Sequence, residues 1–304
     1  MNYQEFLDYI YKRHSGNVRL GLERMEAILK EMDEPNNKIS GIHIAGTNGK
    51  GSTAAMCEAI CKEHGLKTGL NTSPHLVDYR ERIRINCQNV KLKELMQTYK
   101  KWEDVFEKYE ASFFEITTAM AFWLFYKHNI EASIFEVGLG GRLDGTKPFN
   151  SAVTVITSIS YDHTKSLGNK IEKIAFEKAG ILKQTIPVVL GKMPDEAYRV
   201  ISEIASQKNI PIWNFQNNFK VQNVSIDSKG THLDYSDEET TLKDLKLNLI
   251  GKHQANNAAL AITASKLFLK NIGILPNSNK IRIALQKTDW LGRMQILQHN
   301  PLVL

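Results

Sequence analysis

A repeated alternation of short apolar segments with longer helical stretches most constrains the fold of this 304-residue chain. The apolar segments are rich in β-branched residues and lie at 41–46, 67–73, 132–138, 152–160 and 186–191. Apolar runs of this length, bounded by glycine and polar residues, are typical of fully buried strands. Buried strands that alternate with helices predict an α/β fold, in which a mostly parallel sheet is covered by helices on both faces.

Two of the intervening stretches are clear helix candidates. In "GKGSTAAMCEAICKEHG" (49–65), the apolar positions Ala55, Met56, Ala59 and Ile60 are predicted to form one face of a helix that Gly65 ends. The stretch "SFFEITTAMAFWLFYKHN" is almost wholly apolar. It therefore predicts a helix that is buried on all sides.

Residues 211–250 interrupt the alternation. The segment "NFKVQNVSIDSKGTHLDYS" has a Lys-Gly turn between two alternating runs, which predicts antiparallel hairpins and hence a small β appendage. The stretch "HQANNAALAITASKLFLKNIG" then predicts a helix that ends at Gly273. The last residues, "GRMQILQHNPLVL", predict a strand, a turn at Asn300-Pro301 and the start of another buried strand.

A glycine-rich loop joins the first buried segment to the first of these helices, in "GIHIAGTNGKGSTAAM". The usual phosphate-binding loop reads Gly-x₄-Gly-Lys-Ser/Thr. That spelling would require a glycine where this chain has Ile44. Here Gly46 precedes Gly49 by only three positions, and one more glycine separates Lys50 from the hydroxyl residues.

The position of this loop, between a buried strand and a helix, predicts phosphate binding, because backbone N–H groups and the positive helix end face an incoming anion. Lys50 would supply a charge for the β- and γ-phosphates, and Ser52 or Thr53 a hydroxyl for phosphate or Mg²⁺. The alternative is a glycine-rich turn with a solvated lysine. The predicted nucleotide-binding residues of the loop are Gly46, Thr47, Asn48, Gly49, Lys50, Gly51, Ser52 and Thr53.

Charge and cysteine use limit the class of protein. The net charge is +6, but Lys and Arg are scattered and interrupted by acidic runs, which favours small polyanions such as ATP over nucleic acid as partners.

No apolar run approaches the roughly 18–20 residues of a membrane span. The start of the chain lacks the apolar region of a signal peptide. Together with three cysteines in no framework spacing, this predicts a cytoplasmic protein. Cys57 and Cys61 have a spacing that suits a metal, but no second pair completes such a site, so packing is the favoured interpretation.

The chain resembles the folylpolyglutamate synthase/dihydrofolate synthase family of the Mur ligase superfamily, whose ATP loop reads GTNGKxS/T. The resemblance is carried, in family order, by "GLERM", "AGTNGKGST", "TSPHLVDYRERIRIN", "FFEITTAMAF", "EVGLGGRLDGT", "SISYDHTKSLG", "EKAGILK", "GKHQANNAALA" and "WLGRMQIL". It implies a P-loop-type fold, the Mur-ligase central domain. It also implies an ATP-dependent ligase that joins L-glutamate to folate, to dihydropteroate or to both. In that reaction the acceptor carboxylate attacks the γ-phosphate, and the glutamate amine then displaces phosphate from the acyl phosphate.

The resemblance further implies two Mg²⁺ ions, held by Ser73, Glu136 and His163. Ser73 and His163 follow predicted strands at the edge where α/β sheets bind ligands, and a buried carboxylate at Glu136 needs a partner. From the residues alone, the alternatives are a turn serine, a salt-bridged carboxylate and a structural histidine. Asp162 either orients the imidazole of His163 or acts elsewhere.

Four further residues take their roles from the resemblance. Lys178, in "EKAG", is expected to be catalytic with Lys50 and His163 and to carry a carbamate, which requires an amine of lowered pKa. Asn257, and with it Gln254, is expected to contact the nucleotide; the alternative is helix capping and polar pairing in the core. Arg293 is expected to reach the nucleotide phosphates.

The chain departs from the family at two places. Family members usually read "GGRLDATN", whereas this chain has Gly145 and Lys147, and this loop lies on the pterin side in the family. The family also continues past the last residue here with a C-terminal α/β domain. We therefore expect an ATP-binding domain at 1–298 with the β appendage at about 211–250, and a linker and the start of a truncated domain at 299–304. Alone, this chain should fold and bind nucleotide weakly as a monomer, without forming the amide.

Two alternatives remain open at this point. One is a Mur enzyme that adds an amino acid to a UDP-sugar peptide, against which "SPHLVDYRERIRIN" and "EVGLGGRLDGT" favour folate. The other is a non-catalytic module that binds ATP or nucleic acid. Nucleic-acid binding would fall steeply with salt, whereas Mg-ATP binding would need Mg²⁺ and Lys50.

Overall fold

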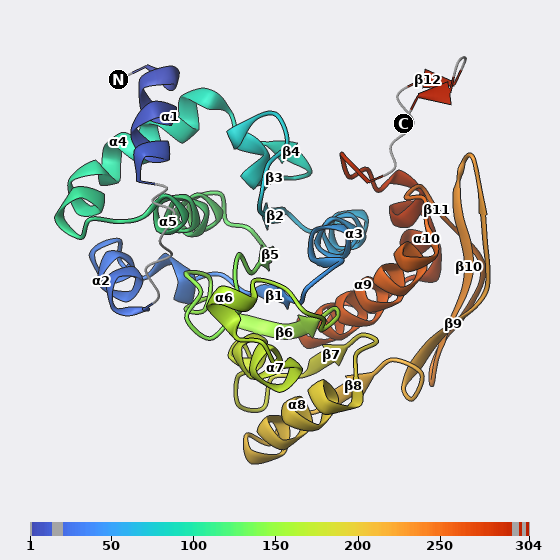
Figure 1. The fold of residues 1–304 in the computed structure, drawn as a ribbon. Helices are drawn as coiled ribbons and strands as arrows, with labels where there is room; N and C mark the ends of the chain where they lie inside the picture. The colour runs from blue at the N-terminus through green and yellow to red at the C-terminus, as the bar shows by residue number, and fades with distance from the viewer. Residues whose placement is uncertain (1, 14–20, 294–297, 300–301, 304) are drawn as a thin grey trace.

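A large, mostly parallel sheet is the centre of the computed structural model, which describes residues 2–13, 21–293, 298–299 and 302–303. Within these residues the sheet has eight strands in the order β4-β3-β2-β5-β1-β6-β7-β8 (Figure 1). The strands are β1 (Gly41–Ala45), β2 (Thr68–Asn71), β3 (Ile83–Ile85), β4 (Gln88–Asn89), β5 (Ala132–Glu136), β6 (Ser151–Ile156), β7 (Val188–Leu190) and β8 (Ile212–Asn214). Strands β2, β5, β1, β6, β7 and β8 are parallel to one another. At one edge of the sheet, β3 pairs antiparallel with β2, and β4 pairs antiparallel with β3.

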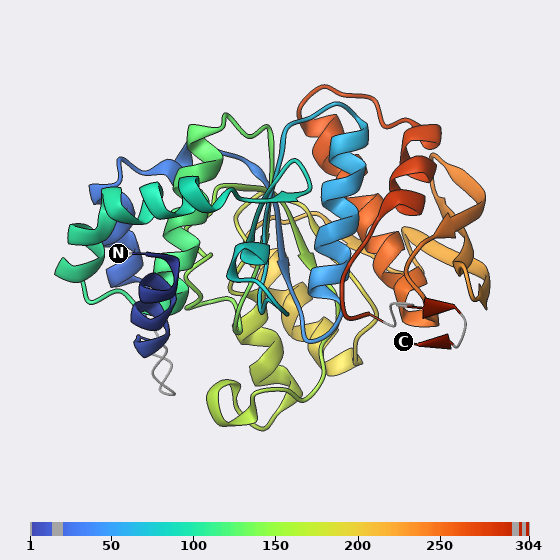
Figure 2. The same cartoon turned by 90° about the horizontal axis from the view of Figure 1, so that it is seen from above.

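Helices cover both faces of the sheet, as the alternation predicted (Figure 2). The α-helices are α1 (Tyr3–Lys12), α2 (Glu23–Glu31), α3 (Lys50–Glu63), α4 (Leu92–Lys108), α5 (Phe113–Lys127), α6 (Thr164–Leu167), α7 (Ile171–Ala179), α8 (Asp195–Gln207), α9 (Lys252–Asn271) and α10 (Ser278–Lys287). Short 3₁₀ helices lie at η1 (Pro35–Asn37) and η2 (Tyr79–Arg82).

The hydrophobic core is divided by the sheet. Helices α3, α9 and α10 pack on one face, where Ile42 and Ile44 of β1 contribute to the shared core. On the other face, α1, α2, α4 and α5 pack around Phe135 of β5, and α7 and α8 pack on β7. Each inner strand therefore buries both its faces, which explains why the strands are continuous apolar runs rather than alternating ones.

The predicted helix faces agree with the structure in part. Helix α5 is buried along most of its length, as its composition predicted. In α3, Met56 and Ile60 lie in the core, Ala59 packs against the same core, and Ala55 is buried; Ala55 and Ala59 also line a pocket. The expected face is therefore buried, but so are further sides of α3, because this helix is packed by β5 and by α9 and α10.

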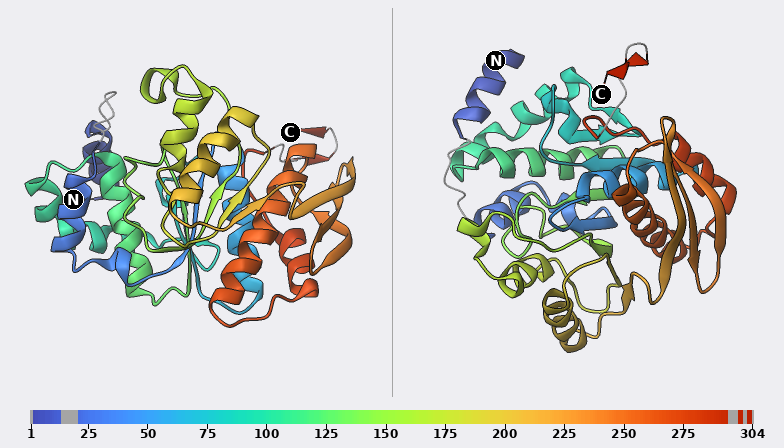
Figure 3. Two further views of the ribbon diagram at one scale, coloured as in Figure 1. Left: turned by 90° about the horizontal axis from the view of Figure 1, so that it is seen from below. Right: turned by 45° about the vertical axis from the view of Figure 1, so that its right-hand side comes forward.

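The β appendage is a three-stranded antiparallel sheet of β9 (Phe219–Asp227), β10 (Gly230–Asp237) and β11 (Thr241–Leu247), which packs on α9 (Figure 3). The Lys-Gly turn joins β9 to β10 as expected. The expected range of 211–250 also includes β8, and that strand pairs with β7 in the large sheet. A buried ion pair between Lys266 of α9 and Asp237 of β10 fixes the appendage to the helix.

The expected strand–turn–strand at the end of the chain corresponds to β12 (Gln298–His299) and β13 (Leu302–Val303), which pair antiparallel. The predicted turn at Asn300-Pro301 lies outside the described residues. Residue 304 of the segment expected as a linker at 299–304 also lies outside them. Among the described residues, no helix has the length and apolarity needed to cross a membrane.

Candidate active site

The glycine loop lies at the carboxyl edge of the sheet, where β2, β5, β1 and β6 end side by side. Gly46 has φ 145°, and a side chain there would overlap the hydroxyl of Thr157, just beyond β6. The N–H of Thr47 donates to Ser158 O at 2.8 Å, and Thr157 Oγ1 donates to Asn48 O at 2.6 Å. The loop is therefore held against the end of β6, and glycine at 46 is required by this close approach.

Gly49 begins α3 as its N-cap, with φ 85°. A side chain on Gly49 would overlap Asn257 Oδ1, so α9 approaches the loop directly at this point. Asn257 Nδ2 donates to Gln254 Oε1 at 3.0 Å, and Gln254 Nε2 lies 3.3 Å from Ser52 Oγ. The predicted nucleotide residues of α9 and of the loop thus form one connected polar network at the N-terminus of α3, where free N–H groups and the helix dipole favour an anion.

Two lysines converge on the same loop carbonyl. Lys50 Nζ donates to Gly46 O at 3.0 Å, and Lys178 Nζ donates to the same oxygen at 2.8 Å. Lys178 is 2% exposed, although it lies far from the loop in sequence, on α7. Burial, and then the charge of Lys50, lower the pKa of Lys178 to about 8. A substantial fraction of this amine is therefore neutral near pH 8, which is the form that reacts with CO₂.

Glu136 ends β5 and faces the loop from the neighbouring strand. It is 5% exposed, and its carboxylate accepts a hydrogen bond from the N–H of Ser73 at 3.1 Å. Burial raises the pKa of Glu136 to about 7, against the opposing charge of Lys50. No salt-bridge partner lies within 4.0 Å among the described residues, so the salt-bridge alternative is not supported. A buried carboxylate with one N–H partner and a hydroxyl residue beside it fits a hard divalent cation.

His163 does not join this pair. It is the N-cap of α6, with φ 46°, and its side chain is 58% exposed. Its Nε2 lies 3.6 Å from Asp162 Oδ1, which is beyond hydrogen-bond distance, so the orienting role of Asp162 stays a prediction. Within the described part of the chain, no three His, Cys, Asp or Glu side chains are grouped closely enough to hold a metal ion.

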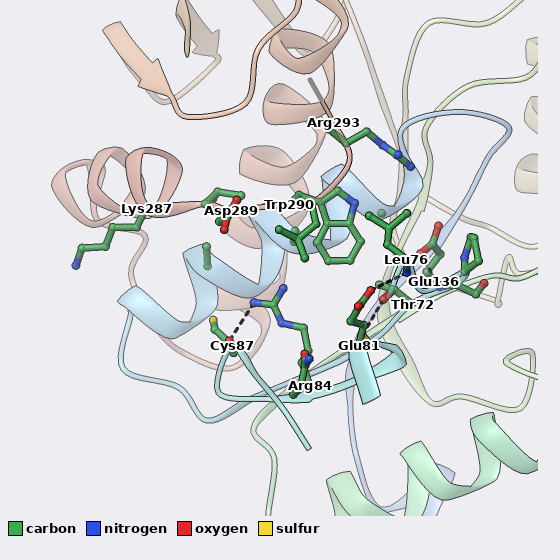
Figure 4. Close-up of a pocket in the computed structure, with 18 residues that line it drawn as sticks. Thr72, Leu76, Glu81, Arg84, Cys87, Glu136, Lys287, Asp289, Trp290 and Arg293 are labelled. Carbon is green, nitrogen blue, oxygen red and sulfur yellow. Dashed lines mark hydrogen bonds between the residues drawn. The ribbon is translucent and has the colours of Figure 1, made fainter. Parts of the chain in front are cut away.

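A pocket of about 440 Å³ opens beside Glu136, between α3, the loop after β2, the β3–β4 hairpin and the segment after α10 (Figure 4). Its wall includes Ser73 and Leu76 on one side and Trp290 on the other. The expected phosphate ligand Arg293 also lines it; this side chain is exposed, and its Nη1 donates to Gly292 O at 3.1 Å. The pocket therefore joins the carboxylate to a cleft whose lining is both charged and apolar.

Trp290 and Arg84, which both line the pocket, are residues to which the sequence interpretation gave no individual role. The indole of Trp290 lies over Gly51, where an added side chain would come within 3.0 Å of the ring. Arg84 lies 5.9 Å from the indole centre and pairs with buried Glu58 at 3.1 Å. The signal was present, since three arginines follow one another at alternate positions in "YRERIRIN".

Gly145 and Lys147, the two residues that differ from the usual family sequence, lie between β5 and β6. Gly145 lies against the ring of Phe114, with 3.3 Å between the ring and an added Cβ. Burial, and then Lys183 and Lys208, lower the pKa of Lys147 to about 8. Cys57 and Cys61 are both free thiols in the core, which agrees with the packing interpretation.

Residues 44–265 match the family described as Mur ligase middle domain. The chain is 36% identical over 306 residues to a dihydrofolate synthase/folylpolyglutamate synthase of Bacillus subtilis, covering 98% of this chain and 71% of that protein. It is similar to a structure of the apo form of L. casei FPGS, with a TM-score of 0.96, 30% identity and coverage of 99% of this chain and 75% of that one. A structure described as an FPGS-AMPPCP-folate complex is similar at a TM-score of 0.94 and 30% identity, covering 100% of this chain and 76% of that one.

Proposed function

This chain belongs to the Mur ligase family and, within it, to the folylpolyglutamate and dihydrofolate synthases, and from this membership we propose that it joins L-glutamate to a folate-type acceptor at the expense of ATP. The acceptor is tetrahydrofolate, dihydropteroate or both. The observation that carries the proposal is the convergence of Lys50, Lys178 and Glu136 on a glycine loop at a helix N-terminus.

The first step transfers a phosphoryl group. An oxygen of the acceptor carboxylate attacks the γ-phosphorus of ATP, and the bond to ADP breaks with its electron pair remaining on ADP. The loop N–H groups and the ammonium group of Lys50 bind the phosphates and stabilise the charge of the transition state. Lys50 is anchored at Gly46 O and Thr47 O, which keeps its charge at the loop before the nucleotide binds.

The second step forms the amide. The glutamate amine attacks the carbonyl carbon of the acyl phosphate, phosphate leaves, and the amine loses a proton. Exclusion of water from the acyl phosphate at this stage would favour the amide over hydrolysis.

Glu136 and Ser73 are the residues that would hold a magnesium ion. When bound there, Mg²⁺ would neutralise phosphate charge near the loop. The buried carboxylate of Glu136, with the Ser73 N–H as its hydrogen-bond partner, supports this assignment. His163 as a ligand, and a second ion, stay predictions. So do a monomeric state and a cytoplasmic location.

A carbamate on Lys178 is the finer part of the proposal. The amine is buried, its pKa is lowered to about 8, and the Lys50 ammonium group lies beside it. Carbamylation would turn this repulsion into attraction, because the modified side chain carries a negative charge next to Lys50.

A coupled phosphate-release assay tests the function. ATP, glutamate and either dihydropteroate or tetrahydrofolate are supplied to the 304-residue chain, and in a parallel reaction a Mur-ligase C-terminal domain is added. Phosphate release that requires both glutamate and a pterin in either reaction supports the proposal and shows whether this chain acts alone. Release that instead requires a UDP-sugar peptide, or no release in any reaction, contradicts it.

A further inference from the structure

Arg82, at the end of η2, is a buried arginine that has no acidic partner among the described residues. Its two neighbours of the same kind are paired: Arg80 lies 2.6 Å from Asp78, and Arg84 lies 3.1 Å from Glu58. Arg82 is 7% exposed, yet no carboxylate of the described residues lies within 4.0 Å of it. Its Nε donates to His75 Nδ1 at 2.7 Å, which leaves the N–H groups of both Nη atoms without a protein acceptor in the described part.

An arginine in this position is costly to the fold. Partial burial of the side chain lowers the pKa of Arg82, although its Nη atoms keep some exposure to solvent. A buried charge is normally paired and fully hydrogen-bonded. Arg82 satisfies neither condition among the described residues, whereas Arg84 has buried Glu58 as its ion-pair partner. The structure therefore offers an anion an unoccupied set of donors.

The surroundings of the guanidinium are aromatic. Its carbon lies 4.9 Å from the centre of the Phe113 ring. Tyr11 stacks on the same ring, with 5.5 Å between centroids and 20° between planes, and is 40% exposed. His75 accepts from Arg82, so it is the neutral tautomer with its proton on Nε2, 3.1 Å from the hydroxyl of Tyr11. The donors of Arg82 thus lie among flat apolar surfaces, one of which reaches solvent.

This group also lies next to the proposed site of chemistry. Arg82 O accepts a hydrogen bond from the N–H of Thr72, immediately before Ser73, whose own N–H donates to Glu136. The Arg82 charge acts on the Glu136 carboxylate and lowers its pKa, although less than Lys50 does. The side chains of this group come from the loop after β2, η2, the end of α1 and the start of α5.

We propose that Arg82 binds the carboxylate of the acceptor substrate, and that Tyr11, which reaches solvent, packs against the aryl group that carries it. The inference rests on the proposed function, because it assigns a part of that same site. A guanidinium can hold a carboxylate through two parallel N–H···O bonds, which fixes its orientation as well as its position. The required ligand is an aryl-linked carboxylate; a phosphate on the same donors is the competing possibility, which the experiment distinguishes.

The experiment compares a carboxylate with its amide. Binding of dihydropteroate and of dihydropteroate carboxamide is measured by calorimetry on the full 304-residue chain, with Mg²⁺ and the ATP analogue AMPPCP present at saturation. The variants are Arg82→Gln, Arg82→Lys and the control Arg80→Gln, which removes a neighbouring charge that Asp78 already pairs. Affinity for AMPPCP and thermal stability are measured for each variant.

The wild-type chain and Arg80→Gln should bind the acid on the order of 10²-fold more tightly than the amide. Arg82→Gln should abolish this preference while the affinity for AMPPCP stays within about twofold, and Arg82→Lys should keep part of it. A purely structural role for Arg82 would weaken acid and amide equally, which overturns the proposal. Loss of AMPPCP affinity with the acid preference retained assigns the guanidinium to phosphate and also overturns it.

Failure of the proposed function has a different signature. If the wild-type chain binds neither pterin compound, the acceptor class is wrong and both assignments fall. If it binds both and Arg82→Gln leaves the acid preference unchanged, only the assignment of Arg82 fails. Should Arg82→Gln not fold, Arg82→Lys decides, because a lysine retains the charge but cannot form the two-point contact, and an undiminished preference then contradicts the proposal.

Discussion

The ammonium groups of Lys50 and Lys178 share one acceptor, the carbonyl oxygen of Gly46, at 3.0 and 2.8 Å. Two like charges at one oxygen repel each other, and the lowered pKa of Lys178 is partly a consequence of Lys50. The arrangement suits a site that receives a polyphosphate, since an incoming anion relieves the repulsion.

Carbamylation of Lys178 is the first prediction. In ¹³C-labelled bicarbonate near pH 8, where the amine is partly neutral, the chain should show one carbamate signal by NMR that Lys178→Ala lacks. In the complete ligation assay, Lys178→Ala should lose activity that short carboxylic acids partly restore by filling the gap. A spectrum without this signal at saturating bicarbonate would count against the carbamate.

The pH dependence of stability is the second prediction. The pKa of Lys178 is lowered in the fold from 10.5 to about 8. The folded state therefore carries a penalty that is complete below pH 8, shrinks as the pH rises and is absent above 10.5. The penalty amounts to roughly 3 kcal/mol, and the hydrogen bond to Gly46 returns about 1 kcal/mol.

Lys178→Met removes both the penalty of the buried charge and the hydrogen bond to Gly46 O. Urea unfolding without bicarbonate should show it about 2 kcal/mol more stable than the wild-type chain at pH 6.5 and slightly less stable above pH 10.5. Lys173→Met, an exposed position on the same helix, is the control and should not change with pH in this way. A constant difference between Lys178→Met and the wild-type chain across this range would contradict the burial argument.

Loss of nucleotide binding in Lys50→Ala is the third prediction. The side chain lies at the loop and contributes no core packing, so the melting temperature should change little while calorimetry shows no binding of Mg-ATP. Lys62→Ala is a matched control at the far end of α3, where the lysine donates to Asn86 O. Unchanged affinity in Lys50→Ala would refute the assignment of the loop.

The fourth prediction concerns the contact between the loop and α9. Gly49→Ala places a side chain in a left-handed conformation, at a cost of roughly 1 kcal/mol, and against Asn257 Oδ1. It should weaken binding of ATP and lower stability. Adding Asn257→Ala opens the space, so the double variant should recover part of the stability but not the affinity, if Asn257 also contacts the nucleotide. A double-mutant cycle without coupling would show that the two residues act independently.

Glu136→Gln is the fifth prediction. The amide keeps an acceptor for the Ser73 N–H but removes the charge, so the affinity for ATP should lose its dependence on Mg²⁺ while the affinity without metal is unchanged. Glu63→Gln, a surface position near Lys287, is the control. A nucleotide-bound structure with magnesium away from Ser73 and Glu136 would contradict the assignment.

The sequence predicted the convergence of the loop, Ser73 and Glu136 correctly. Each follows a buried apolar run, and the carboxyl ends of parallel strands meet at one edge of a sheet whatever the details of packing. His163 follows a strand by the same rule, yet it lies exposed, because the chain continues for several residues beyond β6 before it turns at φ 46°. A residue that follows a strand is therefore predicted to lie near this edge of the sheet, but its exact position and burial depend on the conformation of the loop.

The sequence by itself determined the α/β layering, the glycine loop and the family, because strand and helix periodicity and the spacing of glycines are local properties. Only the tertiary structure decided which charged side chains are buried and with what partner. Nothing in "EKAG" distinguishes Lys178 from a solvated lysine, and nothing in "RERIR" separates unpaired Arg82 from paired Arg84. These differences arise from which elements pack around each side chain, since desolvation and the charge of residues distant in sequence set its environment.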